Sequence, residues 1–392
     1  MADEVINRRR RRFCRTAALT LAGAGLAVLD KAQAQPDNSK LRTAQQGTHT
    51  SFAPLKAINA GLLNVGYAEA GPNDGPVVIL LHGWPYDIHS FVEVAPVLAA
   101  SGYRVIVPYL RGYGTTRFLQ SGTVRNGQQS VVAVDAIALM DALKIEKAII
   151  GGFDWGARTA NIVAALWPQR CKAMVSVSGY LIGSQEAGKI PLPPSAELQW
   201  WYQYYFATER GRAGYDKYRH DFGKLIWQLA SPKWNFDQAT FDRSAAALDN
   251  PDHVAVVIHN YRWRLGLAQG EAKYDDLEKR LAAFPAISVP TITMEGDANG
   301  APHPEPSAYA KNFTGYTREA GSRPGPGKRN VDPTGIWCLA RPGFRAAARS
   351  ALEVYPCRGR RIARFVPELT RRRAAKSRKL GSLWTVLLNN LS

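Results

Sequence analysis

The chain has 392 residues, of which 46% are hydrophobic and 21% are charged, so a wholly disordered or fibrous protein is excluded. Its formal net charge of +18 is concentrated at the two ends. Residues 1–34 carry +4 and residues 316–392 carry +13, which leaves only +1 for residues 35–315. A nucleic-acid-binding surface needs a basic folded body, so the charge distribution argues against a nucleic-acid partner.

The first 34 residues have the three parts of a secretory signal peptide. Five arginines at 8–12 precede an apolar run over 17–29, and residues 32–34 (Ala-Gln-Ala) form a small-x-small cleavage site. The apolar run is too short to span a membrane, and an Arg pair followed by x-Phe favours the twin-arginine route. We therefore expect export by the twin-arginine machinery, a periplasmic or secreted location, and no stable membrane insertion of the mature form.

Short apolar segments alternate with helical patterns through the middle of the chain. Buried parallel strands are predicted over 77–81, 104–108, 148–152, 173–177 and 291–294, and helices over 91–100, 131–143 and 156–167. Two earlier segments, 55–59 and 62–69, predict an antiparallel edge hairpin. This alternation predicts an α/β fold, with a mostly parallel sheet flanked by helices.

A long insertion separates the fourth and fifth predicted strands. Residues 183–285 are rich in aromatic side chains and in helical pattern. We interpret them as a helical cap over the carboxyl ends of the strands, where such sheets bind ligands. The core is then expected over 35–182, and its remainder over 286–315.

The segment 152–156 (Gly-Phe-Asp-Trp-Gly) follows the third predicted strand directly and opens a helix. It has the form of a nucleophile elbow, with Asp154 where a lipase has serine. A helix N-terminus favours the carboxylate, and an aspartate there can attack carbon and form an ester. The alternative is an ordinary N-cap aspartate. The segment 82–85 (His-Gly-Trp-Pro) after the first predicted strand argues against that alternative.

These motifs resemble those of the epoxide hydrolase branch of the α/β-hydrolase fold. Segment 82–85 resembles the family's HGxP loop, segment 111–114 its RGxG loop and segment 154–156 its nucleophile elbow. The resemblance covers about residues 51–315. It implies an α/β-hydrolase fold with Asp154 as the nucleophile.

The resemblance also implies roles for four further residues. Segments 202–206 and 260–262 resemble the two cap segments that carry ring-opening tyrosines, so Tyr202 and Tyr261 would donate hydrogen bonds to the epoxide oxygen. The backbone N–H groups of Trp84 and Trp155 would form the oxyanion hole. Either tyrosine could instead be a packing residue with a satisfied hydroxyl.

The second half of the reaction needs an acid and a histidine that activates water. Asp297, in the loop after strand 291–294, is the candidate acid, with a turn aspartate as the alternative. The last histidine of the sequence is His303, so the family's histidine after the last strand has no counterpart. His303 is a candidate substitute base.

Residues 316–392 are rich in Arg, Ala, Gly and Pro and show no sustained apolar period, which predicts a basic, largely unstructured tail. An out-of-frame end of the gene is one hypothesis for this composition and for the missing histidine.

The leading prediction is therefore an exported hydrolase of epoxide hydrolase type that acts on a small apolar epoxide without a metal or other cofactor, and whose turnover is impaired by the missing histidine. Haloalkane dehalogenases share the elbow and the HGxP loop, so a halide substrate is the first alternative. A non-catalytic ligand-binding relative is the second alternative. Halide release, diol formation or ligand affinity without turnover would distinguish the three.

Overall fold

The computed structural model describes residues 51–52, 54–296, 300, 306–315 and 317–321. All of them belong to the compact unit Gln46–Ser392, which is the larger of two units in the chain. Several sequence predictions lie outside the described residues: the signal peptide, Asp297, His303 and the tail from 322 onward.

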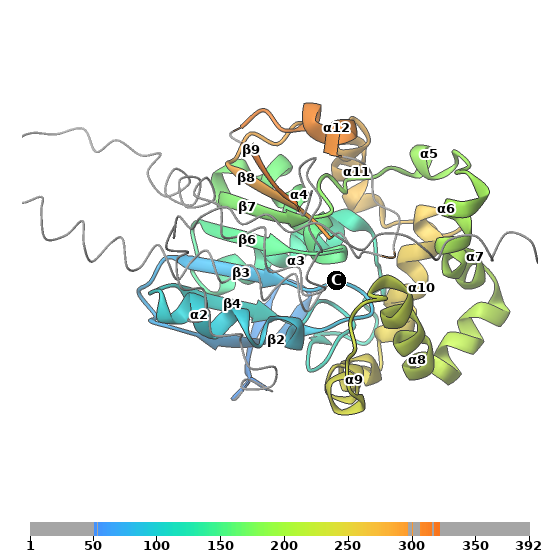
Figure 1. Ribbon diagram of the computed structural model, residues 1–392, viewed down its shortest axis with the longest axis horizontal. Helices are drawn as coiled ribbons and strands as arrows, with labels where there is room; N and C mark the ends of the chain where they lie inside the picture. The colour runs from blue at the N-terminus through green and yellow to red at the C-terminus, as the bar shows by residue number, and fades with distance from the viewer. Residues whose placement is uncertain (1–50, 53, 297–299, 301–305, 316, 322–392) are drawn as a thin grey trace, which may run out of the picture. The chain divides into compact units, whose positions relative to one another are not determined.

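A sheet of nine strands forms the centre of the described chain (Figure 1). The strands are β1 (Lys56–Ala60), β2 (Leu63–Ala70), β3 (Val77–Leu81), β4 (Arg104–Pro108), β5 (Arg117–Phe118), β6 (Ala148–Gly152), β7 (Cys171–Val177), β8 (Thr291–Glu295) and β9 (Thr317–Gly321). Eight of them follow the order β1-β2-β4-β3-β6-β7-β8-β9, and β5 pairs with β2. Strands β3, β4 and β6 to β9 are parallel, whereas β2 is antiparallel to its neighbours β1, β4 and β5. The mostly parallel sheet and its edge hairpin agree with the prediction.

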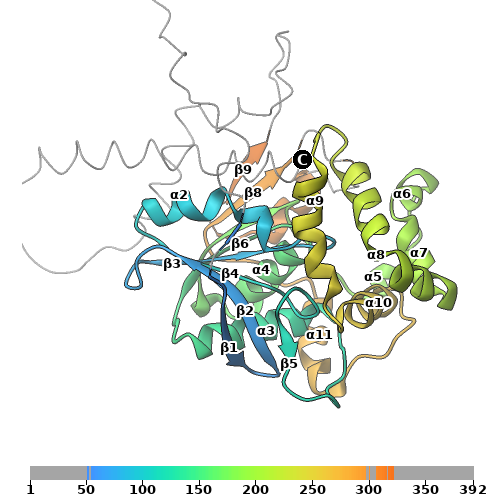
Figure 2. The same cartoon turned by 90° about the horizontal axis from the view of Figure 1, so that it is seen from below.

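Helices cover both faces of this sheet. The helix α2 (Val94–Ala100) packs on one face, while α3 (Gln129–Ala142), α4 (Trp155–Leu166) and α11 (Asp275–Ala282) lie on the other (Figure 2). Because water reaches neither face, the central strands are continuously apolar, as in β3, where four of five residues are buried. The shorter connecting helices are η2 (Ile88–Phe91), η3 (Pro168–Arg170), η5 (Ala272–Tyr274), α12 (Pro306–Tyr309) and η6 (Ala310–Asn312).

A group of helices between β7 and β8 forms a separate layer beside the sheet (Figure 1). Its members are α5 (Gln185–Gly188), α6 (Pro194–Gln199), α7 (Trp201–Ala207), α8 (Glu209–Ala230), α9 (Gln238–Ala245), η4 (Ala246–Asp249) and α10 (His253–Arg264). The layer meets the loop that follows β3, where the rings of Trp84 and Tyr202 lie 5.0 Å apart. All of these helices fall within the insertion expected over 183–285, whose limits as a domain remain a prediction. Among the described residues, no helix combines the length and apolar character that a membrane crossing requires.

The sheet continues past the point where the sequence predicts its end. Strand β9 pairs in parallel with β8 from Thr291↔Thr317 to Glu295↔Gly321, although the low-order tail was expected from residue 316. The segment Thr-Arg-Glu-Ala-Gly has no apolar alternation. Backbone hydrogen bonds to β8 hold this segment in the sheet. Because such bonds do not depend on the side chains, the amino-acid composition of the segment does not predict them.

Candidate active site

Asp154 occupies a sharp turn between β6 and α4. It is the N-cap residue of α4, with φ +51° and ψ −120°, a left-handed conformation that is rare for a residue other than glycine. The turn is possible because Gly156 has no side chain: a Cβ there would lie 1.9 Å from the carbonyl oxygen of Leu81. The chain therefore presents the Asp154 side chain at the end of the sheet, as the elbow motif predicts.

The Asp154 carboxylate is held by the loop that follows β3. The backbone N–H of Trp84 donates to Oδ1 of Asp154 at 2.8 Å. A Cβ on Gly83 would lie 2.4 Å from the Asp154 Cβ, so this approach requires glycine. Asp154 retains exposed surface while Phe153 and Trp155 on either side are buried, so a small molecule can reach the carboxylate.

Opposing effects act on the Asp154 carboxyl. Buried neighbours strip the carboxyl of much of its water, which raises its pKa above the ordinary aspartate value although a small molecule can still reach it. The backbone N–H of Trp84, the positive charges of Arg158 and Arg264, and the backbone N–H of Trp155 oppose that rise. The backbone N–H groups of Trp84 and Trp155, which are expected to form the oxyanion hole, both lower the pKa of Asp154. They therefore stabilise negative charge at this position.

The two candidate tyrosines face each other across this site from different helices. Tyr202 comes from α7 and Tyr261 from α10, with ring centroids 5.4 Å apart and ring planes at 84°. Both rings also pack on Trp84, at 5.0 Å and 5.3 Å. Burial, together with the charge of Asp154, raises the pKa of Tyr202 to about 12 and raises that of Tyr261 as well. Both hydroxyls are therefore protonated at neutral pH and can donate hydrogen bonds.

A buried chain of hydrogen bonds joins the helical layer to the core, and the sequence motifs gave no sign of it. The indole Nε1 of Trp84 donates to the Tyr215 hydroxyl at 2.8 Å, and that hydroxyl lies 2.8 Å from Nε2 of His253. Nδ1 of His253 lies 2.9 Å from the carbonyl oxygen of Gly112 and donates to it. Nδ1 of His253 carries a hydrogen, because the carbonyl oxygen of Gly112 can only accept. The Tyr215 hydroxyl accepts from Trp84, so it donates its own hydrogen to Nε2 of His253, and the imidazole is neutral. Burial lowers the pKa of His253 to about 3, which keeps it neutral.

None of the five histidines within the described ranges makes a hydrogen bond to Asp154. His82 accepts from the backbone N–H of Leu110 at 3.1 Å and donates to the carbonyl oxygen of Gly83, and burial lowers its pKa to about 4. The others are engaged elsewhere: His89 with Asp87, His220 with Asp249, His253 with Tyr215, and His259 with Gly127 and Gln269. The described site therefore holds the residues that the sequence predicts for ester formation: Asp154, Trp84, Trp155, Tyr202 and Tyr261. The candidates for the second step, Asp297 and His303, lie outside the described residues.

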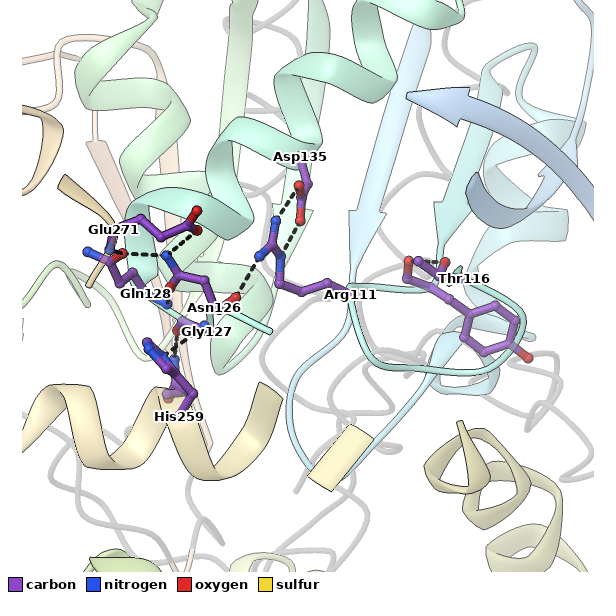
Figure 3. Close-up of polar contacts among 10 residues, drawn as sticks. Arg111, Thr116, Asn126, Gly127, Gln128, Asp135, His259 and Glu271 are labelled. Atoms are coloured by element: carbon purple, nitrogen blue, oxygen red, sulfur yellow. Dashed lines mark hydrogen bonds and ion pairs between the residues drawn. The ribbon is translucent and has the colours of Figure 1, made fainter. Parts of the chain in front are cut away.

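Arg111 of the RGxG segment has a positioning role (Figure 3). Its guanidinium, 1% exposed, forms a bidentate pair with Asp135 of α3 at 2.6 Å and 2.7 Å and donates to the carbonyl oxygen of Asn126. Asn126 in turn donates to Glu271 at 2.9 Å. These contacts fix the loop that carries Gly112, and through Gly112 they support His253.

No group of three or more metal-binding side chains occurs in the part of the chain that the structure describes. The site consists of a carboxylate, backbone N–H donors and phenol hydroxyls. Such groups suit attack by the carboxylate on a carbon whose leaving group is an oxygen or a halide.

Comparison with known proteins places this chain in a family. A family model described as the alpha/beta hydrolase fold matches residues 76–216. A crystal structure from Klebsiella pneumoniae, described as that of a candidate epoxide hydrolase, is 60% identical, with a TM-score of 0.70. The match covers 77% of this chain and 98% of that one. The chain belongs to the epoxide hydrolase-like branch of the α/β-hydrolase family.

Curated relatives of this branch share shorter stretches with the chain. Epoxide hydrolase B of Mycobacterium tuberculosis is 32% identical over an alignment of 157 positions, which covers 37% of this chain and 44% of the relative. Epoxide hydrolase 3 of Siraitia grosvenorii is 38% identical over 121 residues, which are 31% of this chain and 37% of the relative. The chain thus spans less than half the length of these curated epoxide hydrolases.

Proposed function

We propose that this α/β-hydrolase opens an epoxide through an ester on Asp154. One observation carries the proposal: a carboxylate at a strained elbow, bonded at 2.8 Å to the Trp84 N–H, lies beneath two cap tyrosines whose rings are 5.4 Å apart. A carboxylate that can attack and paired phenols that can donate are the two groups that ring opening needs.

In the first step an oxygen of Asp154 bonds to an epoxide carbon, and the bond between that carbon and the ring oxygen breaks. Tyr202 and Tyr261 donate hydrogen bonds to the oxygen as negative charge develops on it, and one of them supplies its proton. In the second step a water oxygen bonds to the ester carbonyl carbon, the bond between that carbon and the alkyl oxygen breaks, and the diol leaves. The proton released from water returns to the tyrosine that gave one up, so that the Asp154 carboxylate is restored. The N–H groups of Trp84 and Trp155 stabilise the tetrahedral oxyanion, an interaction worth about 3 kcal/mol per donor in other hydrolases.

The second step needs a base that activates water. General-base assistance contributes about 10²- to 10⁴-fold to such a step. The described histidines are all engaged elsewhere, and no histidine follows residue 303 in the sequence. We therefore propose that the ester forms faster than it is hydrolysed, so that the alkyl-enzyme accumulates, unless His303 with Asp297 supplies the base.

One observation favours dehalogenation as a second candidate function. The indole Nε1 of Trp155 is buried beside Asp154 and next to the Tyr261 hydroxyl, and such a donor could hold a leaving halide. The neighbouring indole of Trp84 is not free for that task, because it donates to Tyr215. The two facing tyrosines therefore make the epoxide the better substrate class.

The proposal is tested by matched substrates. The enzyme is mixed with styrene oxide or with phenethyl bromide at neutral pH. Unreacted substrate is extracted into organic solvent, free diol and bromide are measured in the aqueous phase, and diol bound as ester is released by hydrolysis of the substrate-free protein. Diol from the epoxide without bromide release supports the proposal, whereas bromide release alone supports dehalogenation. The Asp154→Ala variant should lose the reaction. Asp237→Ala is the matched control, because Asp237 caps the exposed N-terminus of α9 by accepting from Thr240. Affinity for styrene oxide without any product would indicate a non-catalytic ligand-binding relative.

We also propose that the chain is exported through the twin-arginine machinery and cleaved after residue 34. The support is the arginine run, the apolar segment and the Ala-Gln-Ala site of the sequence. N-terminal sequencing of periplasmic material tests it, and exported material that begins at Met1 would contradict it.

A further inference from the structure

Tyr86 directly follows the segment 82–85 and lies beside the nucleophile. Its backbone N–H donates to the carbonyl oxygen of Gly83 at 3.0 Å, and a Cβ on Gly83 would lie 2.4 Å from the Asp154 Cβ. The Tyr86 ring packs edge to face on Phe153, the residue before Asp154, with ring centroids 5.5 Å apart. Burial, and to a smaller extent the negative charge of Asp154, raises the pKa of Tyr86 to about 12. The phenol is therefore protonated at neutral pH and close to the carboxylate.

Tyr86 also packs on the helical layer. Its ring stacks on Trp227 of α8, with centroids 4.8 Å apart and ring planes at 15°. Its hydroxyl lies 3.5 Å from Oγ of Ser231, the residue that follows α8 and is only 1% exposed. The backbone N–H of Gly300, in the loop after β8, donates to the carbonyl oxygen of Ala230 at 2.9 Å. The hydroxyl pair therefore lies next to the loop in which the sequence predicts the groups of the second step.

The two hydroxyls leave one hydrogen without an acceptor. Hydrogen bonds between oxygens usually measure about 2.7–2.8 Å, so the separation of 3.5 Å between Tyr86 and Ser231 is a weak contact. Within the described residues neither side chain makes another hydrogen bond, so only one of their two hydroxyl hydrogens has an acceptor. Buried hydroxyls are almost always bonded, and water is the usual partner where protein groups are lacking. Asp154 retains exposed surface, so water reaches the carboxylate beside which Tyr86 lies.

We propose that Tyr86 and Ser231 hold the water that hydrolyses the ester on Asp154. This inference rests on the proposed ester and names positioning residues for its second step. The remaining hydroxyl hydrogen donates to the water oxygen, and the water donates one of its hydrogens to the other hydroxyl. One lone pair of the water is then left for the ester carbonyl carbon, and one hydrogen is left for the base.

The atoms balance without a further reactant. The water oxygen bonds to the ester carbonyl carbon, and the bond between that carbon and the alkyl oxygen breaks. One hydrogen of the water ends on the alkyl oxygen of the diol, and the other ends on the tyrosine that gave its proton to the epoxide oxygen. Tyr86 stays protonated throughout, because its pKa is about 12, so it positions the water and is not the base.

The first experiment separates formation of the ester from its hydrolysis. The full chain is loaded with styrene oxide, free epoxide is removed by rapid desalting, and decay of the adduct is followed by intact-protein mass spectrometry. Loss of one hydrogen bond to the water predicts decay about tenfold slower in Tyr86→Phe, with ester formation changed by less than about twofold. A merely structural role would slow both steps, so equal slowing of formation and decay would overturn the inference.

Tyr103→Phe is the matched control. Tyr103 is buried and directly precedes the amino end of β4, so it lies at the opposite end of the parallel strands from Asp154, and its loss should leave both rates unchanged. Ser231→Ala should slow decay by a similar factor to Tyr86→Phe. The double variant should be no slower than the slower single variant, because both hydroxyls hold one water. Losses that multiply would overturn the shared water, and the thermal transition of each variant checks its folding.

The second experiment needs no epoxide. A crystal structure of the unaltered chain should show an ordered water within about 3.2 Å of both hydroxyl oxygens, and a crystal structure of Tyr86→Phe should not. A well-ordered Tyr86 and Ser231 without that water would overturn the inference.

The two experiments separate the inference from the function on which it rests. An ester on Asp154 that decays at the same rate in Tyr86→Phe, or that does not decay in the unaltered chain, would overturn the inference and leave Asp154 as the nucleophile. A water bonded to both hydroxyls, with no ester formed from styrene oxide, would overturn the epoxide chemistry and leave a buried water site.

Discussion

Replacing Tyr215 by phenylalanine tests the buried chain that links the helical layer to the core. The Tyr215 hydroxyl lies between the indole Nε1 of Trp84 and Nε2 of His253, at 2.8 Å from each. Tyr215 and His253 are fully buried and Trp84 is 3% exposed. Tyr215→Phe therefore leaves one donor and one acceptor without partners in a place that water does not reach.

The magnitude follows from the cost of an unsatisfied buried group, about 1–3 kcal/mol each. Two such groups predict that the free energy of unfolding falls by about 2–6 kcal/mol. Urea unfolding followed by tryptophan fluorescence measures this loss. Tyr218→Phe is the matched control on the same helix, because Tyr218 is 52% exposed and its loss should change stability by no more than about 0.5 kcal/mol.

A second readout asks whether the chain also positions the site. Trp84 donates its backbone N–H to Asp154 and its indole N–H to Tyr215, so loosening the indole should loosen the loop and slow alkylation of Asp154. A loss of less than about 1 kcal/mol in Tyr215→Phe, with an unchanged alkylation rate, would refute the reasoning about this chain.

Two further predictions concern stability. Arg111→Gln breaks the bidentate pair with Asp135 and should lower the free energy of unfolding, measured in urea, by about 3–5 kcal/mol. Arg170→Gln is the control and should lower it by less than about 1 kcal/mol, because its partner Asp141 is 62% exposed. Similar losses in the two variants would contradict this prediction. The pKa values of His82 and His253, lowered by burial to about 4 and about 3, predict acid sensitivity. The unfolded chain takes up these protons near pH 6.5 and the folded chain does not, so stability is full above pH 6.5 and falls as the pH drops toward 4, by about 1.4 kcal/mol per pH unit for each histidine. Urea unfolding at pH 7, 6 and 5 measures the slope, and equal stability at pH 7 and 5 would show that these histidines do not control it.

The strands and the elbow could be predicted because their signals are local. Runs such as Val77–Leu81 are apolar on both faces, and Gly152 and Gly156 belong to one five-residue motif in which the two glycines contact each other. The pairing of Tyr202 and Tyr261 was predicted from the resemblance to a known family and not from their spacing in the sequence. The two residues lie on separate helices that only the fold brings together.

Other features depend on contacts between distant segments, which no local pattern reports. Tyr215 meets Trp84 across 131 positions of sequence, and His253 meets Gly112 across 141. Tyr86 meets Ser231 across 145 positions, and each has an ordinary sequence neighbourhood. Strand β9 is held by backbone pairing, to which its side chains give no clue.

The covalent adduct tests the central claim most directly. The full chain is incubated with styrene oxide, and the adduct is counted by intact mass and mapped by peptide mass spectrometry against diol released over time. We predict one styrene oxide per chain, on Asp154, formed faster than diol is released and absent in Asp154→Ala. An adduct on another residue, or one that persists in Asp154→Ala, would contradict the assignment of the nucleophile. Sustained diol release without an adduct would contradict the proposed accumulation, and its loss in His303→Ala would identify His303 as the base.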